Sequence, residues 1–208
     1  RCLPAKSLAT MAVPIPRHEG QTMTATPPAL HFREDFAGEQ ARIIALFGDV
    51  FTAAEGPDEG AAIAALVAAM AACGPAAGLR PFTAWQGDRL MGAVIFSPLR
   101  DAQAAHRIML LSPMAVATDQ QGRGIGQALI RHALARLAID GTQIAVTYGD
   151  PAFYGRTGFA PVGTDMLPAP QPLSQPIGWI AQSLTGAALP QIQGPLACVA
   201  PLDDPAFW

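Results

Sequence analysis

The stretch DQQGRGIGQALIRHAL, residues 119–134, places three glycines within five positions where a helix is predicted to begin. Apolar side chains then recur every four residues, which predicts a helix to about Ile139 with a buried side formed by Ile125, Leu129, Ala133 and Leu137. Each glycine in a helical turn costs about 0.5–1 kcal/mol relative to alanine. The chain therefore needs the glycines for something other than helix formation; they are Gly122, Gly124 and Gly126.

An anion is the partner that such a junction favours. The first turn of a helix presents unpaired N–H groups and a partial positive charge, and residues without side chains let a phosphate approach them closely. Arg123 adds a fixed positive charge between two of the glycines. The alternative is a tight turn that needs glycine only for its backbone angles.

The spacing of the glycines narrows the choice of phosphate ligand. The dinucleotide fingerprint is G-x-G-x-x-G, whereas this loop reads G-x-G-x-G and has Gln127 where the last glycine would fall. That fingerprint also normally opens the first βαβ unit, but here two predicted helices and a hairpin come first. A P-loop is excluded, because no Gly-Lys-Ser/Thr sequence follows.

The chain before the glycines alternates between helix and strand patterns. A strand is predicted at 30–36, a helix around 43–51, and a second helix that Asp58 can cap and that stops at Gly74-Pro75. Strands at 81–86 and 90–98 flank a Gly-Asp pair, which is a strong hairpin signal. A third strand at 107–117 is more apolar and contains Pro113, which predicts a bulge or a local opening of the sheet.

The chain after the glycine helix continues as strand, short helix and strand. Residues 143–150 read as a strand, 151–158 as a short helix with Pro151 in its first turn, and 159–162 as another strand. From residue 163 the sequence becomes rich in proline, which predicts a loop, and further strands are expected at 177–184 and 194–202. This order predicts one α/β layer structure with helices on a mixed sheet.

Composition excludes several function classes. The net charge is −3 with no long basic tract, so we expect no nucleic-acid partner. The uncharged run 60–79 is mostly alanine and is broken at Gly74-Pro75, so we expect a buried helix and no membrane span. The three cysteines lie far apart without metal-ligand spacing, which predicts reduced cysteines, no metal site and a cytoplasmic protein. Residues 1–28 are expected to be a disordered leader or a remnant foreign to the natural protein.

Two motifs together resemble the GNAT superfamily of acyl-CoA-dependent N-acetyltransferases. Residues 121–126, QGRGIG, match the Q/R-x-x-G-x-G/A signature, and GDPAFYGRTGF at 149–159 resembles the Y-x-x-x-G-F block of a bacterial subgroup. The resemblance implies an α/β fold with a mixed, mostly antiparallel sheet of about six to seven strands flanked by helices. It places an N-acetyltransferase domain at 29–163 and a proline-rich C-terminal extension at 164–208, packed on the same domain.

The resemblance implies acetyl-CoA as cosubstrate and places it on named residues. The pyrophosphate would lie on the loop, with contacts from Gln121, Gly122, Arg123, Gly124, Ile125, Gly126 and Gln127. The pantetheine arm would pair like an added strand with Met114, Ala115 and Val116. Pro113 would help to open the slot that the arm enters.

The implied chemistry is direct attack of a primary amine on the thioester. Backbone N–H groups such as that of Val116 can stabilise the oxyanion. Tyr154 occupies the family's general-acid position, and a phenol with a pKa of about 10 can protonate the departing thiolate. The alternative for Tyr154 is an aromatic residue packed beside Phe153 and Phe159, with its hydroxyl at the surface.

The general base is left open, because residues 107–117 contain no carboxylate. The candidates are Asp150, which could equally cap the short helix, and the acids Glu55, Asp58 and Glu59, which are more typical of a solvated turn. A water chain could also carry the proton away. Arg156 could contact a CoA phosphate or form a surface ion pair.

The sequence leaves the acceptor and any partner open. A small molecule or a peptide could supply the amine, and the C-terminal segment could build a homodimer interface. The alternative function is a member of the same fold that binds CoA or a partner without turnover.

Overall fold

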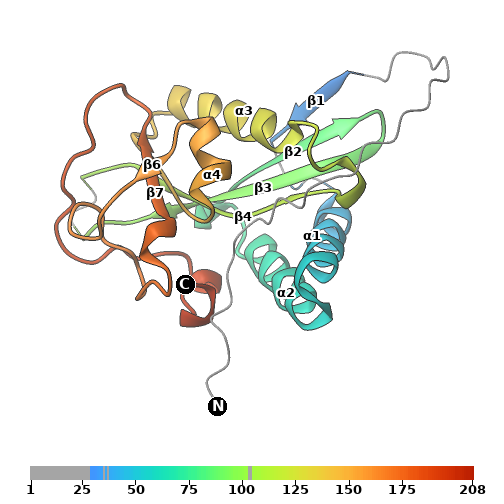
Figure 1. Cartoon of the computed structure of the whole chain (residues 1–208), viewed down its shortest axis with the longest axis horizontal. Helices are drawn as coiled ribbons and strands as arrows, with labels where there is room; N and C mark the ends of the chain where they lie inside the picture. Colours follow the sequence, from blue (N-terminus) through green and yellow to red (C-terminus); the bar gives the residue numbers. More distant parts are fainter. Residues whose placement is uncertain (1–28, 35, 37, 103–104) are drawn as a thin grey trace.

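The structure is a computed structural model that describes residues 29–34, 36, 38–102 and 105–208 (Figure 1). Its centre is a seven-stranded sheet with the order β1-β2-β3-β4-β5-β7-β6, in which only β4 and β5 run parallel. The strands are β1 Leu30–Arg33, β2 Arg80–Gln86, β3 Arg89–Leu99, β4 Ile108–Val116, β5 Ile144–Tyr148, β6 Ala160–Pro161 and β7 Trp179–Ser183. The helices are α1 Gln40–Glu55, α2 Pro57–Ala72, α3 Ile125–Ile139 and α4 Pro151–Tyr154. The predicted mixed, mostly antiparallel α/β fold is confirmed.

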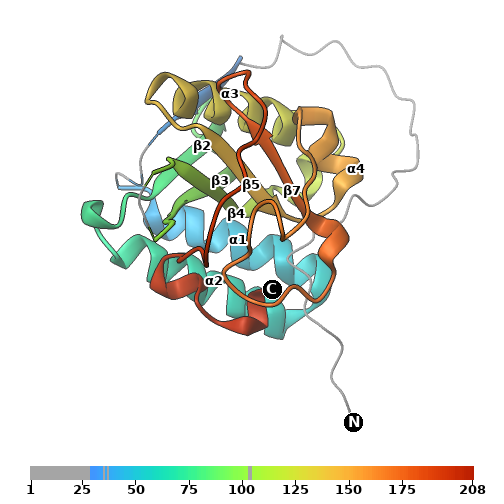
Figure 2. The same ribbon diagram turned by 90° about the vertical axis from the view of Figure 1, so that its left-hand side faces the viewer.

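The helices cover both faces of the sheet, with α1 and α2 on one side and α3 on the other (Figure 2). Strand alternation supplies both faces: in β3, Ile95 packs toward α1 and α2, whereas Phe96 packs toward α3. The expected spacing on α3 is confirmed, because its buried residues are Ile125, Gly126, Leu129, Ile130, Ala133, Leu134 and Leu137.

Several expected boundaries move in the structure. Asp58 is not an N-cap, because α2 begins one residue earlier at Pro57, whose fixed φ suits the first helical position after Gly56. The first strand ends at Arg33, short of the expected residue 36. The expectations for residues 1–28 lie outside the described residues. Within the described part of the chain, no helix is long and apolar enough to cross a bilayer.

Strands β4 and β5 separate at the point where Pro113 predicts an opening. The two strands pair over residues 108–111 of β4. At the end of this pairing, the backbone carbonyl of Leu111 accepts a hydrogen bond from the side chain of Thr147, whose Oγ1 lies 2.9 Å away. On its other side, β4 slips register against β3, so that Ser112 and Pro113 together face Ile95. The expected bulge and opening are both confirmed. Residues 114–116 remain paired with β3, but no strand of the described part of the chain pairs with them on the β5 side.

The C-terminal segment completes the sheet, because β7 lies between β5 and β6. The strand expected at 177–184 is confirmed as β7. Its first residue, Trp179, is fully buried, and its indole Nε1 donates to the Leu167 carbonyl at 2.8 Å. The strand expected at 194–202 is wrong: only a single bridge joins Ala197 to Arg100, since the prolines at 195 and 201 lack the N–H that a ladder needs.

Replacing Trp179 by phenylalanine (Trp179→Phe) is expected to lower the free energy of unfolding by about 1–3 kcal/mol, because the buried Leu167 carbonyl loses its donor. Chemical denaturation monitored by circular dichroism measures this change. The control is Ile177→Ala, since that side chain lies two residues away and is 73% exposed. It should stay within about 0.5 kcal/mol of the parent. Equal effects of the two changes would show that the hydrogen bond from Trp179 to the Leu167 carbonyl contributes little to stability.

Candidate functional site

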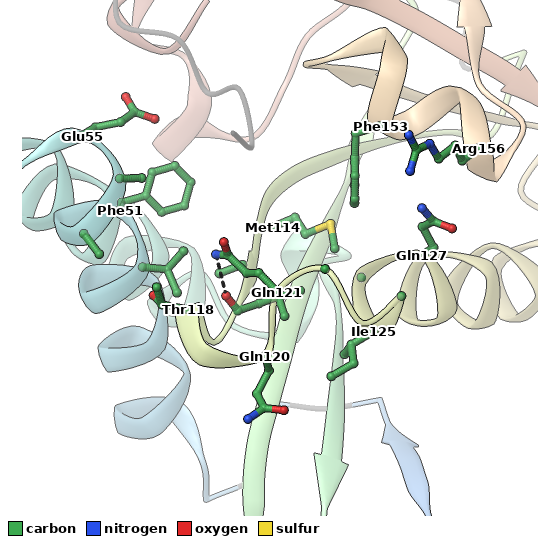
Figure 3. A pocket seen from close by; sticks show the side chains of 18 residues that line it. Phe51, Glu55, Met114, Thr118, Gln120, Gln121, Ile125, Gln127, Phe153 and Arg156 are labelled. Carbon is green, nitrogen blue, oxygen red and sulfur yellow. Dashed lines mark hydrogen bonds between the residues drawn. The ribbon is translucent and has the colours of Figure 1, made fainter. Parts of the chain in front are cut away.

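A cavity of about 220 Å³ lies where β4, α1 and the start of α3 meet (Figure 3). The end of α1 forms one wall, the open edge of β4 the floor, and the glycine loop with α4 the opposite wall. The lining residues are Val50, Phe51, Ala53, Ala54, Glu55, Met114, Ala115, Val116, Thr118, Gln120, Gln121, Gly122, Gly124, Ile125, Gly126, Gln127, Phe153 and Arg156. Nine of the ten expected cofactor-binding residues are among them, and Arg123 is not.

The glycine loop delivers the first turn of α3 to this cavity. Gly122 and Gly124 have φ of +75° and +77°, a left-handed conformation that residues with side chains rarely adopt. Gly124 is the N-cap, no side chain caps the helix, and the first hydrogen bond within it runs from Ala128 N to Gly124 O at 3.0 Å. The N–H groups of Ile125, Gly126 and Gln127 come before that first bond and so have no acceptor within the helix. They are therefore suited to bind an anion in the cavity.

Gly126 is required for space rather than for its backbone angles. A Cβ at this position would lie 2.7 Å from Met114 Cε, 3.2 Å from Phe153 Cζ and 3.3 Å from Val116 Cγ2. All three side chains line the cavity. The glycine thus leaves room between α3, α4 and β4 beside the cavity.

The edge of β4 presents backbone groups to the cavity. Ala117 N donates to Met91 O at 2.9 Å, so this residue points toward β3. Because strand residues alternate, the backbone groups of Met114 and Val116 point the other way, toward the gap that β5 leaves. The Val116 carbonyl accepts from Gln121 Nε2 at 3.1 Å. That leaves the Val116 N–H as a donor directed at the open edge.

Only two of the described residues that line the cavity carry ionisable side chains, and these are Glu55 and Arg156. They come from opposite walls, with Glu55 on α1 and Arg156 beside Gln127 at the start of α3 (Figure 3). Glu55 is an exposed residue, yet partial desolvation of its carboxyl, and then the nearby charge of Glu59, raise its pKa above the ordinary value.

Arg156 lines the cavity, whereas Arg123 does not. Its backbone carbonyl accepts from Arg131 Nη2 at 2.8 Å, which ties the turn to α3. Among the described residues Arg156 forms no ion pair, so the surface ion pair considered for it is not found. The Arg123 side chain instead donates to Gln120 Oε1 at 3.1 Å.

The structure does not bring the three expected catalytic side chains into the cavity. The Tyr154 ring lies edge-on to those of Phe153 and Phe159, with ring centroids 5.0 Å and 5.8 Å apart, as the packing alternative expected. The residue is only 3% exposed, however, so it is buried rather than at the surface. Asp150 caps α4, accepting from Ala152 N at 2.8 Å, which confirms the capping interpretation. Glu59 is buried in the first turn of α2 and does not line the cavity.

Comparison with known proteins points to one family. Residues 78–161 match the acetyltransferase (GNAT) domain family. An uncharacterized N-acetyltransferase of Escherichia coli K12, YjhQ, is 32% identical over 118 residues, which are 55% of this chain and 63% of that protein. The chain thus spans less than two thirds of the length of this curated relative.

Two solved structures with bound cosubstrate share the fold. The GNAT family N-acetyltransferase YhbS of Escherichia coli, in complex with CoA, has a TM-score of 0.72 and 22% identity, covering 89% of this chain and 97% of that one. A GNAT family acetyltransferase of Brucella melitensis, in complex with acetyl-CoA, has a TM-score of 0.62 and 26% identity, covering 84% and 99%. The overall fold of this chain therefore matches the folds of both.

Proposed function

Because this chain belongs to the GNAT superfamily of N-acetyltransferases, we propose that it transfers an acetyl group from acetyl-CoA to a primary amine. One observation carries the proposal. The uncapped first turn of α3 and the unpaired edge of β4 line the same cavity, so an anion and an extended arm can be held together. The CoA and acetyl-CoA complexes of the two structural relatives support this choice of ligand.

The pyrophosphate of CoA would accept hydrogen bonds from the first N–H groups of α3, with Arg156 supplying the balancing charge. The pantetheine arm would add to the edge of β4 beside Met114 and Val116. This brings the thioester next to the Val116 N–H. A backbone donor in that position stabilises the oxyanion that forms when the amine attacks.

Tyr154 is the proposed proton donor to the departing thiolate. It follows Phe153 directly, and the Phe153 ring lines the cavity and contacts the Tyr154 ring at its edge. A phenol of pKa about 10 can protonate a thiolate during C–S cleavage. This role requires the Tyr154 hydroxyl to reach the sulfur when the pantetheine arm of CoA occupies the cavity.

A catalytically silent CoA-binding protein is the second candidate. The observation that favours it is the lack of a carboxylate in β4, together with the packing of Tyr154 outside the cavity lining. Thermal shift and thiol release separate the two candidates. Acetyl-CoA at about 100 times its Kd should raise stability by about 2.7 kcal/mol, whereas NAD should not. Release of free CoA that depends on an added amine identifies the enzyme; stabilisation without such release identifies the silent binder.

Replacing Arg156 by glutamine (Arg156→Gln) is expected to weaken CoA binding about tenfold, or by about 1.4 kcal/mol, because one charge-assisted contact to phosphate is lost. Isothermal titration with CoA measures this. The matched control is Arg123→Gln, since Arg123 lies in the glycine loop but does not line the cavity. It should change the Kd less than about twofold. The reverse order of the two effects would place the phosphates on Arg123 instead.

A further inference from the structure

Glu55 is the only acidic side chain that lines the cavity among the residues that the structure describes. It is the last residue of α1 and stands across the cavity from Arg156 (Figure 3). Within the described part of the chain, no hydrogen bond or ion pair engages its carboxylate. Its charge is therefore available to something that enters the cavity.

The other acids considered for the base are placed elsewhere. Asp150 accepts from the backbone of α4, Glu59 is buried in α2, and Asp58 is exposed in the first turn of that helix. None of the three lines the cavity. Of these four acids, Glu55 therefore lines the cavity and the other three do not.

The two walls of the cavity have opposite electrical character. The α3 wall combines a helix N-terminus with Arg156, which suits the phosphates. The α1 wall combines Glu55 with the C-terminal end of a helix, where the aligned peptide dipoles favour a cation. Val50 and Phe51, one turn before Glu55, give that wall an apolar surface. A molecule with a positive charge on an apolar stem fits it.

We propose that Glu55 binds the acceptor amine as its ammonium ion and accepts the proton whose loss makes the amine nucleophilic. The substrate class is then a primary amine that is protonated at neutral pH. This role rests on the proposed function, because it needs the thioester beside Val116. The raised pKa of the Glu55 carboxyl supports it, since a stronger base accepts the proton more readily.

The protons and electrons of the step balance without a further reactant. The ammonium ion gives one proton to Glu55, and the neutral amine forms a C–N bond to the thioester carbonyl carbon. When the C–S bond breaks, its electron pair leaves on sulfur, which takes a proton from Tyr154. Tyr154 regains a proton from the nitrogen, and Glu55 releases its proton to water.

The test uses the full chain with acetyl-CoA, an amine panel and two variants. Phenethylamine, 1,4-diaminobutane and lysine amide are cationic at pH 7, whereas trifluoroethylamine is already neutral. Glu55→Gln removes the proposed base, and Asp58→Asn removes the same charge three residues away, outside the cavity. Thiol release measures kcat/KM, and isothermal titration measures the Kd of CoA.

Glu55→Gln should lower kcat/KM for the cationic amines about 100-fold. The loss should be under about fivefold for trifluoroethylamine, which has no proton to give before attack. Asp58→Asn should change kcat/KM less than about twofold, and the Kd of CoA should stay within about twofold of the parent in both variants. Equal kcat/KM for the two variants on the cationic amines would overturn the role of Glu55 alone. No acetylation of any amine by the parent, with CoA bound, would overturn the proposed function and this role with it.

Discussion

Replacing Gly126 by valine (Gly126→Val) is expected to weaken CoA binding about 100-fold or more, because a side chain there enters the cavity between Met114, Val116 and Phe153. Even a single Cβ would come within 2.7 Å of Met114 Cε and 3.2 Å of Phe153 Cζ. The flexible end of Met114 can move away, but the larger methyl groups of valine would then take the space the pantetheine arm needs. Isothermal titration with CoA measures the loss.

The control for this substitution is Gly155→Val, at the junction of α4 and the turn that carries Arg156. Gly155 has an ordinary helical backbone, with φ of −56°, and an added Cβ meets nothing within 4 Å. Its Kd for CoA should stay within about threefold of the parent. Thermal unfolding shows whether each variant is folded at the assay temperature. A folded Gly126→Val protein that binds CoA normally would show that the ligand does not occupy this cavity.

Removing the hydroxyl of Tyr154 (Tyr154→Phe) is expected to lower kcat about 100-fold or more while leaving the Kd of CoA unchanged. The phenyl ring keeps the edge contacts with Phe153 and Phe159, so the ring packing is preserved while the proposed proton donor is lost. Steady-state thiol release with the best amine of the panel measures kcat.

Tyr148→Phe is the matched control, since the chain contains only two tyrosines. The Tyr148 hydroxyl accepts from Gln175 N at 2.7 Å and bonds to Ser174 Oγ at 2.9 Å, so it fastens a loop rather than facing the cavity. Its loss should cost some stability but leave kcat within about threefold. A Tyr154→Phe protein with unchanged kcat would mean that the residue only packs, as its buried ring would also allow.

Local signals in the sequence predict the part of the site that is local in the chain. The positive φ of Gly122 and Gly124, the opening at Pro113 and the cap by Asp150 each follow from residue type at one or two positions. Together they predict the loop, the open edge of β4 and the short helix after β5.

The α1 wall of the cavity is not predictable in the same way. Val50 and Phe51 have the spacing of a buried helix face, and periodicity does not distinguish a side chain in the core from one beside a cavity. Arg156 likewise looks like any exposed arginine until the turn after α4 is placed against α3. Both depend on contacts between segments far apart in the sequence.

The insertion of β7 between β5 and β6 is also a long-range feature. The alternating pattern at 177–184 predicts a strand but not its neighbours, and the two-residue β6 is too short to specify the pairing. The apolar composition of residues 194–202 favours a strand, but the two prolines in that segment prevent a regular ladder.

A crystal structure of the full chain with acetyl-CoA tests the central claim most directly. The account predicts pyrophosphate oxygens about 2.7–3.2 Å from the backbone nitrogens of the loop at 121–126. It also predicts the arm of the cosubstrate along β4, with the thioester next to the Val116 N–H and within reach of Glu55. Acetyl-CoA bound elsewhere on the protein, or a cavity left empty at a saturating concentration of acetyl-CoA, would contradict it.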